Sequence, residues 1–424
     1  MRKKLNPMAI AYSLPTVDQL FFQPLTGLVA LSPRTRECPG VSDEAWLRLG
    51  VQRVIEPVVS GRGFLQEHGP RFEQAPSNGT YFAALRSMRR SNLIRDISRT
   101  VTTQANKQLP DRLADIPELE GYECFAMDGH WHKAAAHDPK HKEQRMAVGH
   151  FYSLDLRRHA LRHMATGRGL HEHDMSVLKR LKPKGLRQDV PKGQRTLIVY
   201  DKACIDFDYW KRCRQECAVY FLSRAKEDMV YDCVGETEWD QSDWRNHGVT
   251  ADLKIKTREG HLMRIVFYTD PRTGESYEFL TNEMDLPPGV IVELYRQRWA
   301  VEKVFDQLKN KLHEKKAWGS SPEAKETQAH FLTITHNLML IYEARLEQEH
   351  GIKNEAEDKR RAKRVEESVE KCGIEGKPIS ELLERVQRAT QRSVKFVRWI
   401  RHAIRDRLAE ATAVPRLRLL YSQL

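Results

Sequence analysis

The stretch LPPGVIVELYRQRWAVEKVFDQLKNKL, residues 286–312, sets the fold expected for the rest of the chain, and its pattern predicts one long helix. Asp285 precedes it as the expected N-cap, and the prolines that follow are tolerated in a first turn, where no helical N–H bond is needed. Its apolar residues recur at three- and four-residue spacing and fill one arc of a helical wheel. This arc, which we expect to be buried, holds Leu294, Val301, Val304, Phe305, Leu308 and Leu312.

A stripe of polar residues runs beside this apolar arc. Tyr295, Arg298, Glu302 and Lys309 fall within about 60° of one another on the wheel. A carboxylate can hold a divalent cation, an arginine can bind phosphate through two hydrogen bonds, a lysine contributes a point charge, and a tyrosine adds a hydrogen bond or a stacking surface. The alternative is a solvated charged face, in which Arg298 and Glu302 form an ordinary ion pair one turn apart.

The spacing Tyr-x2-Arg-x3-Glu-x6-Lys, present here as YRQRWAVEKVFDQLK, resembles the signature of the insertion-sequence-four family of bacterial DDE transposases. This resemblance implies a ribonuclease H-like catalytic domain and a β-strand insertion before the helix that bears the glutamate. It also implies two further acids upstream, each at the end of a strand, and a metal-dependent reaction on DNA.

The order of elements predicted upstream agrees with this expectation. The patterns predict strands over 121–128, 145–156 and 159–166, a helix over about 173–182, a strand over 196–201, a helix over 206–216 and a strand over 217–223. Periodicity alone indicates only a mixed α/β fold, and the resemblance supplies the ribonuclease H-like assignment. Asp128 ends the first strand and Asp201 ends the fourth, so adjacent central strands would place both beside Glu302.

Three close carboxylates repel one another unless a cation lies between them, and hard oxygen ligands suit Mg²⁺ or Mn²⁺. The resemblance assigns Asp128, Asp201 and Glu302 as the ligands of two such ions, about 3.5–4 Å apart. It assigns DNA positioning to the other members of the stripe, Tyr295, Arg298 and Lys309. The family often has an arginine after its second acid, where this chain has Lys202, which keeps the charge but loses the bidentate geometry.

The chain divides into three predicted regions. Residues 1–115 form a helical N-terminal region that could bind DNA ends, residues 116–345 form the catalytic domain with its insertion at about 224–284, and residues 346–424 form a helical C-terminal region. Within the last region, residues 379–409 carry apolar side chains at near-helical spacing, which predicts either a dimer face or packing onto the chain's own core. Because two DNA ends must be held together, we expect a homodimer on DNA.

Three arginines and two tryptophans are weaker candidates for DNA contacts. Arg86, Arg89 and Arg90 decorate an approximately helical pattern, which fits either a helix-turn-helix reader of DNA or the basic surface of a small helical bundle. Trp239 and Trp244 lie in the insertion, where a core position is the favoured interpretation and stacking on a displaced base is the alternative.

Histidines near the first acid suggest a rival metal chemistry. His130, His132, His137 and His141 follow Asp128, and His171 and His173 flank Glu172. Such clusters can bind Zn²⁺, although no cysteine lies among them, and phosphate contacts or a loop surface are the favoured interpretations.

Composition and charge limit the classes of partner and compartment. The chain has 424 residues and carries 70 Lys and Arg against 58 Asp and Glu, a net charge of +12, which favours a polyanionic partner. Seven cysteines show no disulfide framework, which indicates a reducing cytosolic compartment. After a basic start, Asn6 and Pro7 interrupt the run that a signal peptide needs, and no stretch is long and apolar enough to span a membrane. We expect a soluble bacterial cytoplasmic protein associated with the nucleoid.

These observations together predict a DNA transposase that cuts at the terminal inverted repeats of its element and joins them to target DNA. A non-catalytic DNA-binding protein derived from a transposase is one alternative, and a metal-dependent nuclease without strand transfer is another. The presence of all three acids and of the four-residue helix signature argues against the non-catalytic alternative.

Overall fold

The computed structural model describes residues 19–350 with short gaps. These gaps are 20, 22, 35, 39, 56–59, 70–75, 136–137, 139, 142–143, 146–147, 168–171, 272, 311 and 313–315. Most of the predicted C-terminal region, including 379–409, therefore lies outside the described residues. Among the described helices, none combines the length and the hydropathy that crossing a membrane would require.

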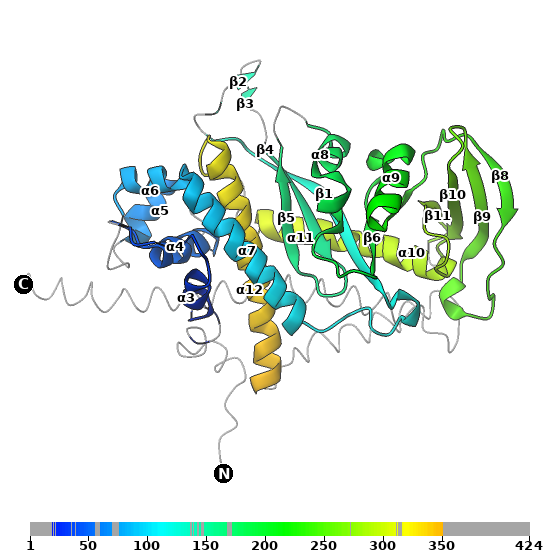
Figure 1. The fold of residues 1–424 in the computed structure, drawn as a ribbon, viewed down its shortest axis with the longest axis horizontal. Coiled ribbons are helices and arrows are strands. Elements are labelled where there is room, and N and C mark those ends of the chain that lie inside the picture. The colour runs from blue at the N-terminus through cyan, green and yellow to red at the C-terminus, as the bar shows by residue number, and fades with distance from the viewer. Residues whose placement is uncertain are drawn as a thin grey trace, which may run out of the picture.

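A helical bundle occupies the left of Figure 1. Its N-terminal members are α3 (Gln23–Ala30), α4 (Asp43–Ile55), α5 (Gly61–His68), α6 (Asn78–Leu85) and α7 (Met88–Gln108). The long helix α12 (Pro322–His350) packs along α7 and also contacts α4. The apolar pattern around the three candidate arginines breaks between α6 and α7, because the Ser87 hydroxyl accepts a hydrogen bond from the Arg90 N–H and starts a new helix.

One nine-stranded sheet forms the centre and the right of Figure 1, in the order β5-β4-β1-β6-β7-β11-β10-β9-β8. Its strands are β1 (Tyr122–His132), β4 (Val148–Asp155), β5 (Leu161–Thr166), β6 (Arg195–Val199), β7 (Val219–Arg224), β8 (Tyr231–Glu236), β9 (Val249–Thr257), β10 (Leu262–Thr269) and β11 (Ser276–Thr281). The neighbours β1, β6 and β7 pair in parallel, and the other pairs are antiparallel. A separate two-stranded ribbon comprises β2 (Lys140–His141) and β3 (Gln144–Arg145).

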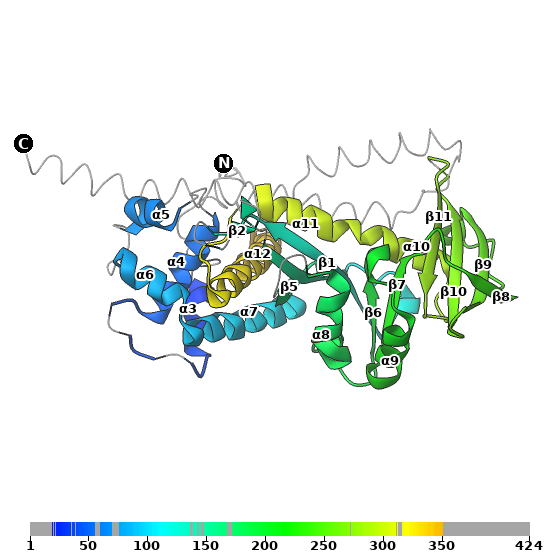
Figure 2. The same ribbon diagram turned by 90° about the horizontal axis from the view of Figure 1, so that it is seen from above.

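Helices cover both faces of the sheet (Figure 2). Helices α10 (Pro288–Gln297) and α11 (Trp299–Asn310) cross one face, and α8 (Asp174–Arg187) and α9 (Phe207–Cys217) lie on the other. Strand β6 shows why two cores form: Leu197 and Val199 join the core under α10 and α11, while Ile198 points into the core under α8 and α9. A strand buried on both faces reads as a continuous apolar run, as predicted for this segment.

The predicted mixed α/β class and the order of elements from β1 to β7 are confirmed. The first strand differs from the prediction, because β1 does not end at Asp128 but continues to His132, paired with β4. The strands of the predicted insertion do not form a separate sheet. They extend the central one, because β11 pairs with β7.

Candidate active site

The two predicted aspartates lie level with each other at one end of the parallel strands. The last paired residues of β1 and β6 are Ala126 and Val199, and Asp128 and Asp201 each follow two residues later. The Asp128 carboxylate accepts a hydrogen bond from the Gly129 N–H at 2.8 Å, and the Asp201 carboxylate accepts one from the Lys202 N–H at 2.7 Å. This parallel register brings the two acids to the same edge of the central sheet, as predicted.

Glu302 lies on a helix that differs from the predicted one. Residues 286–312 form two helices rather than one, because the helix is interrupted at Arg298, between α10 and α11. At the break the Arg298 N–H donates to the Tyr295 carbonyl at 3.0 Å and the Val301 N–H to the Arg298 carbonyl at 3.1 Å, which are three-residue rather than four-residue hydrogen bonds. The break contains neither proline nor glycine.

The predicted N-cap is also wrong. Pro287 occupies the N-cap position of α10 and makes no side-chain cap, whereas the Asp285 carboxylate accepts a hydrogen bond from Arg195 at 2.7 Å. The buried apolar arc is confirmed, since all six of its members are buried.

Arg298 joins two of the three acids. Its guanidinium lies 3.9 Å from the Asp128 carboxylate and 2.9 Å from the Glu302 carboxylate. The Arg298 side chain is 11% exposed, whereas that of Glu302 is 42% exposed, so the arginine lies beneath a carboxylate that faces solvent. The pair of Arg298 and Glu302, for which an ordinary surface ion pair was the alternative, therefore connects α11 to Asp128 on β1.

The rest of the stripe is split between core and surface. Tyr295 is buried against the Phe279 ring, with centroids 4.8 Å apart, and the Arg298 guanidinium carbon lies 5.7 Å from its ring centroid. Lys309 is exposed on the last turn of α11. Trp299, which the sequence analysis did not single out, is 61% exposed directly after Arg298.

A fourth carboxylate, that of Asp174, also lies at the site, although it was not among the predicted site residues. Asp174 begins α8, and a Cβ atom built on Gly129 would lie 2.7 Å from its Oδ1 oxygen, so this carboxylate packs against β1 beside Asp128. Burial raises the pKa of the Cys204 thiol, and the negative charges of Asp174, Asp128 and Asp201 raise it further. An acid at a helix N-terminus is ordinary, so its sequence context gave no signal.

The clustered charges change the acidity of the site. Burial raises the pKa of Asp128 to about 6; the Gly129 N–H and Arg298 oppose this rise, and Asp174 and Glu302 add to it. Burial also raises the pKa of Asp174, with a contribution from Asp201. Holding the ionised carboxylates close together therefore costs free energy, which a bound cation would offset.

The four acids lie near one another, but their carboxylate oxygens do not converge on one position. Among the described residues, no three of these acids have oxygens that all lie within 4.8 Å of one another. Their residue types fit Mg²⁺ or Mn²⁺, which prefer carboxylate oxygens and retain several waters. Glu302 would have to leave Arg298 to reach a cation held by the aspartates.

The weaker candidates occupy different environments. Arg89 donates two hydrogen bonds to Asp43, at 2.7 and 2.8 Å, and the buried Arg90 donates to the Val41 carbonyl, so both guanidinium groups are paired within the fold. Arg86 and Lys202 are exposed.

The core interpretation of the insertion tryptophans is wrong for Trp244, which is 40% exposed; Trp239 is half-buried.

The histidines that follow Asp128 do not form the rival zinc site among the described residues. The His132 ring nitrogen lies 3.0 Å from that of His150, and the His130 ring packs on Phe305. His173 caps α8 and Glu172 pairs with Arg180. His137, His171 and the side chain of His141 lie outside the described residues.

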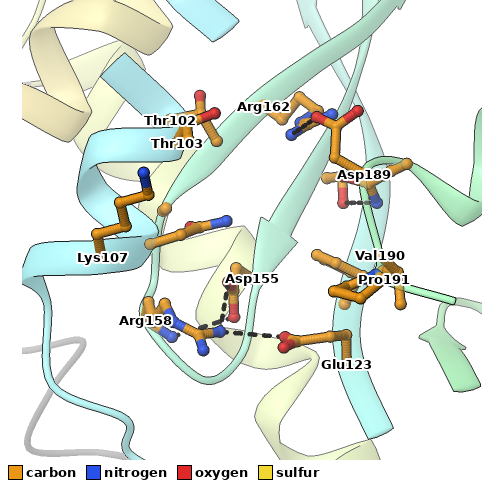
Figure 3. Close-up of a pocket in the computed structure, with 15 residues that line it drawn as sticks. Thr102, Thr103, Lys107, Glu123, Asp155, Arg158, Arg162, Asp189, Val190 and Pro191 are labelled. Atoms are coloured by element: carbon orange, nitrogen blue, oxygen red, sulfur yellow. Dashed lines mark hydrogen bonds and ion pairs between the residues drawn. The ribbon is translucent and has the colours of Figure 1, made fainter. Parts of the chain in front are cut away.

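A cavity of about 290 Å³ lies at the other end of β1 (Figure 3). Its arginines are already paired, Arg158 with Glu123 at 3.0 Å and Arg162 with Asp189 at 2.7 Å. Because these charges are neutralised within the fold and Asp128 does not line the cavity, it is separate from the candidate active site.

Comparisons with known proteins bear on the family of the chain. No curated protein has significant sequence similarity to the chain. Among solved structures, a piggyBac transposase synaptic complex with hairpin DNA, determined by cryo-EM, matches 97% of this chain and 86% of that chain at 12% identity. Its TM-score of 0.36 is too low to establish a shared fold. The profile of the transposase DDE domain matches residues 121–338, the segment that contains Asp128, Asp201 and Glu302. Since this match covers more than half of the chain, the protein belongs to the transposase DDE domain family.

Proposed function

We propose that the protein is a metal-dependent DNA transposase of the insertion-sequence-four type, which cleaves at the terminal inverted repeats of its element and joins the ends to target DNA. The observation that carries this proposal is the position of Arg298, whose guanidinium is shared between Asp128 of β1 and Glu302 of α11. Asp201 lies level with Asp128 across the parallel pair. The shared arginine and the parallel register support grouping these three acids, which are far apart in sequence, in one site.

The sheet supports a ribonuclease H-like assignment for the catalytic domain. In the order β5-β4-β1-β6-β7, three parallel strands lie on one side and two antiparallel strands on the other, and this arrangement supports the assignment. We assign the chemistry to residues 116–345, with the insertion at about 224–284, DNA-end binding to residues 1–115, and dimerisation on DNA to residues 346–424.

Asp128, Asp201 and Glu302 would hold two Mg²⁺ or Mn²⁺ ions. When bound, such ions supply an activated water and stabilise the attacking and leaving oxygens of a phosphodiester. This reaction requires no protein nucleophile, so the same carboxylates would serve both cleavage by water and attack by a DNA 3′ hydroxyl. Asp174 keeps the floor of the site negative and thereby supports cation binding.

The basic side chains around the acids orient DNA. Arg298 holds Glu302 in place before the cation binds, and once released it faces the phosphate with two donors. Lys309 and Lys202 are exposed and provide point charges along the backbone. Tyr295, which is buried, acts by supporting Arg298 rather than by reaching DNA itself.

The test is cleavage and strand transfer of an element end in Mg²⁺ or Mn²⁺. We expect Asp128→Ala, Asp201→Ala and Glu302→Ala each to abolish both reactions while the fold persists. Asp208→Ala is the matched control, because this carboxylate on α9 is 90% exposed and contacts His261 rather than the site. Full activity of any of the three variants would exclude the assignment of that acid.

The two alternatives give different outcomes in the same assay. A nuclease without strand transfer would cleave ends but fail to join a pre-cleaved end to target DNA. A non-catalytic DNA-binding protein would bind end DNA and leave it intact in either metal.

A further inference from the structure

We infer that His163, Glu326 and His330 form a second metal site, which takes a transition-metal cation such as Zn²⁺ and is separate from the carboxylate site. It goes beyond the proposed function, because two imidazoles and one carboxylate are not the ligands that Mg²⁺ selects. Each residue offers one ligand atom, and the three atoms all lie within 4.8 Å of one another.

Packing of α12 on the sheet assembles this group. His163 lies on β5, while Glu326 and His330 lie one turn apart near the start of α12, which packs against both β5 and α7 (Figure 1). Residues four apart on a helix face the same side, so both α12 ligands point at the strand. The His163 and His330 rings meet edge to face, with centroids 4.9 Å apart.

His330 is the strongest indication that a ligand is needed. This residue is 5% exposed, and neither of its ring nitrogens has a hydrogen-bond partner among the described residues. The nearest acceptor is Glu326 Oε1, 3.6 Å from Nε2, which is beyond hydrogen-bonding distance. Buried polar atoms without partners are rare in folded proteins, and a metal–nitrogen bond would satisfy this one.

An outer layer of contacts orients two of the three ligands, Glu326 and His163. Arg95 donates two hydrogen bonds to Glu326 Oε1, at 2.6 and 3.0 Å, which hold this carboxylate in place. His163 lies 3.3 Å from both His150 and Thr166, measured from its Nε2 nitrogen. Such outer contacts fix ring orientation in known metal sites.

Space and charge allow a fourth ligand. A cavity of about 330 Å³ opens beside all three residues and can admit water. Two of the arginines that line it are neutralised, Arg95 by Glu326 and Arg162 by Asp189. In a tetrahedral site with bonds of about 2.0–2.1 Å the ligand atoms are about 3.4 Å apart, so side-chain rotations that move each atom by about 1 Å would close the site.

Metal binding to the full-length protein tests the inference without reference to catalysis. Metal-free protein is titrated with Co²⁺ in excess Mg²⁺, which occupies the carboxylate site, and Zn²⁺ is then added as competitor. We expect one equivalent of Co²⁺ with the visible absorption of a nitrogen-ligated ion, displaced by Zn²⁺. His330→Gln should weaken Zn²⁺ binding by more than about 100-fold, since loss of outer contacts alone costs about 10–100-fold.

His336→Gln is the matched control. His336 lies on the same helix and is equally buried, but its ring contacts the His159 carbonyl, and it does not line the cavity. If His330→Gln does not fold, Glu326→Gln provides the same comparison. Zn²⁺ binding that is absent in the wild type, or is unchanged in the ligand variants, would overturn the inference, and loss of DNA cleavage would not bear on it.

Discussion

Replacing Asp128 with Asn should stabilise the metal-free protein. Burial raises the pKa of this carboxyl from 3.8 to about 6, which corresponds to about 3 kcal/mol of unfavourable free energy in the ionised native state. The side chain is 25% exposed, so solvent screening reduces the expected gain to about 1–2 kcal/mol, or about 2–4 °C in Tm. Asn has nearly the same shape and still accepts the Gly129 hydrogen bond.

The pH dependence gives this gain a distinctive signature. Between pH 4 and pH 6 the native Asp128 binds more protons than the unfolded chain, so wild-type stability falls as pH rises through this window. Below about pH 4 the carboxyl is protonated in both states and the advantage of Asn vanishes. The stability difference between variant and wild type should therefore appear as pH rises from 4 to 7 and then level off.

Thermal unfolding in EDTA and in Mg²⁺ provides the assay. Mg²⁺ at about 100 times its Kd should stabilise the wild type by about 2.7 kcal/mol and Asp128→Asn much less, because a ligand is missing. Asp208→Asn, at an exposed carboxylate on α9, should follow the wild type in both solutions. A variant less stable than the wild type in EDTA at pH 8, or one equally stabilised by Mg²⁺, would refute the reasoning.

Further variants test the remaining contacts. Arg298→Ala should lower Tm in EDTA, because it removes the guanidinium between the Asp128 and Glu302 carboxylates. Added Mg²⁺ should then raise Tm by more than it does in the wild type. An unchanged Tm in EDTA would show that the arginine contact is not stabilising. Val301→Asp should abolish cooperative unfolding measured by circular dichroism, because it buries an unpaired charge at a cost above about 4 kcal/mol. Lys309→Ala should leave Tm unchanged and reduce the salt dependence of DNA binding by about one unit of slope. Asp174→Asn should raise Tm in EDTA; a fall of about 0.3–1 kcal/mol in stability would instead identify it as a helix N-terminal charge only.

The aspartates were predictable because parallel strands convert sequence position into spatial position. Asp128 and Asp201 follow apolar runs that pair in register, so their common edge could be predicted from the strand pattern together with the family resemblance. The break at Arg298 was not predictable, because the apolar spacing continues through it and neither proline nor glycine marks it. The N-cap prediction failed for a different reason: Asp285 is bound by Arg195, a partner that no local pattern reveals.

The site residues that could not be predicted from the sequence lie on helices that flank the sheet. Asp174 has the local context of any acid at a helix start, and only the packing of α8 against Gly129 makes it part of the site. The same holds for His330 on α12, which meets His163 because a long helix lies on the edge strand. Histidines close together in sequence, such as His130 and His132, lie on one strand, so a metal site there would need further ligands from other elements. Ligand sets that span a strand and a distant helix therefore emerge only once the packing is known.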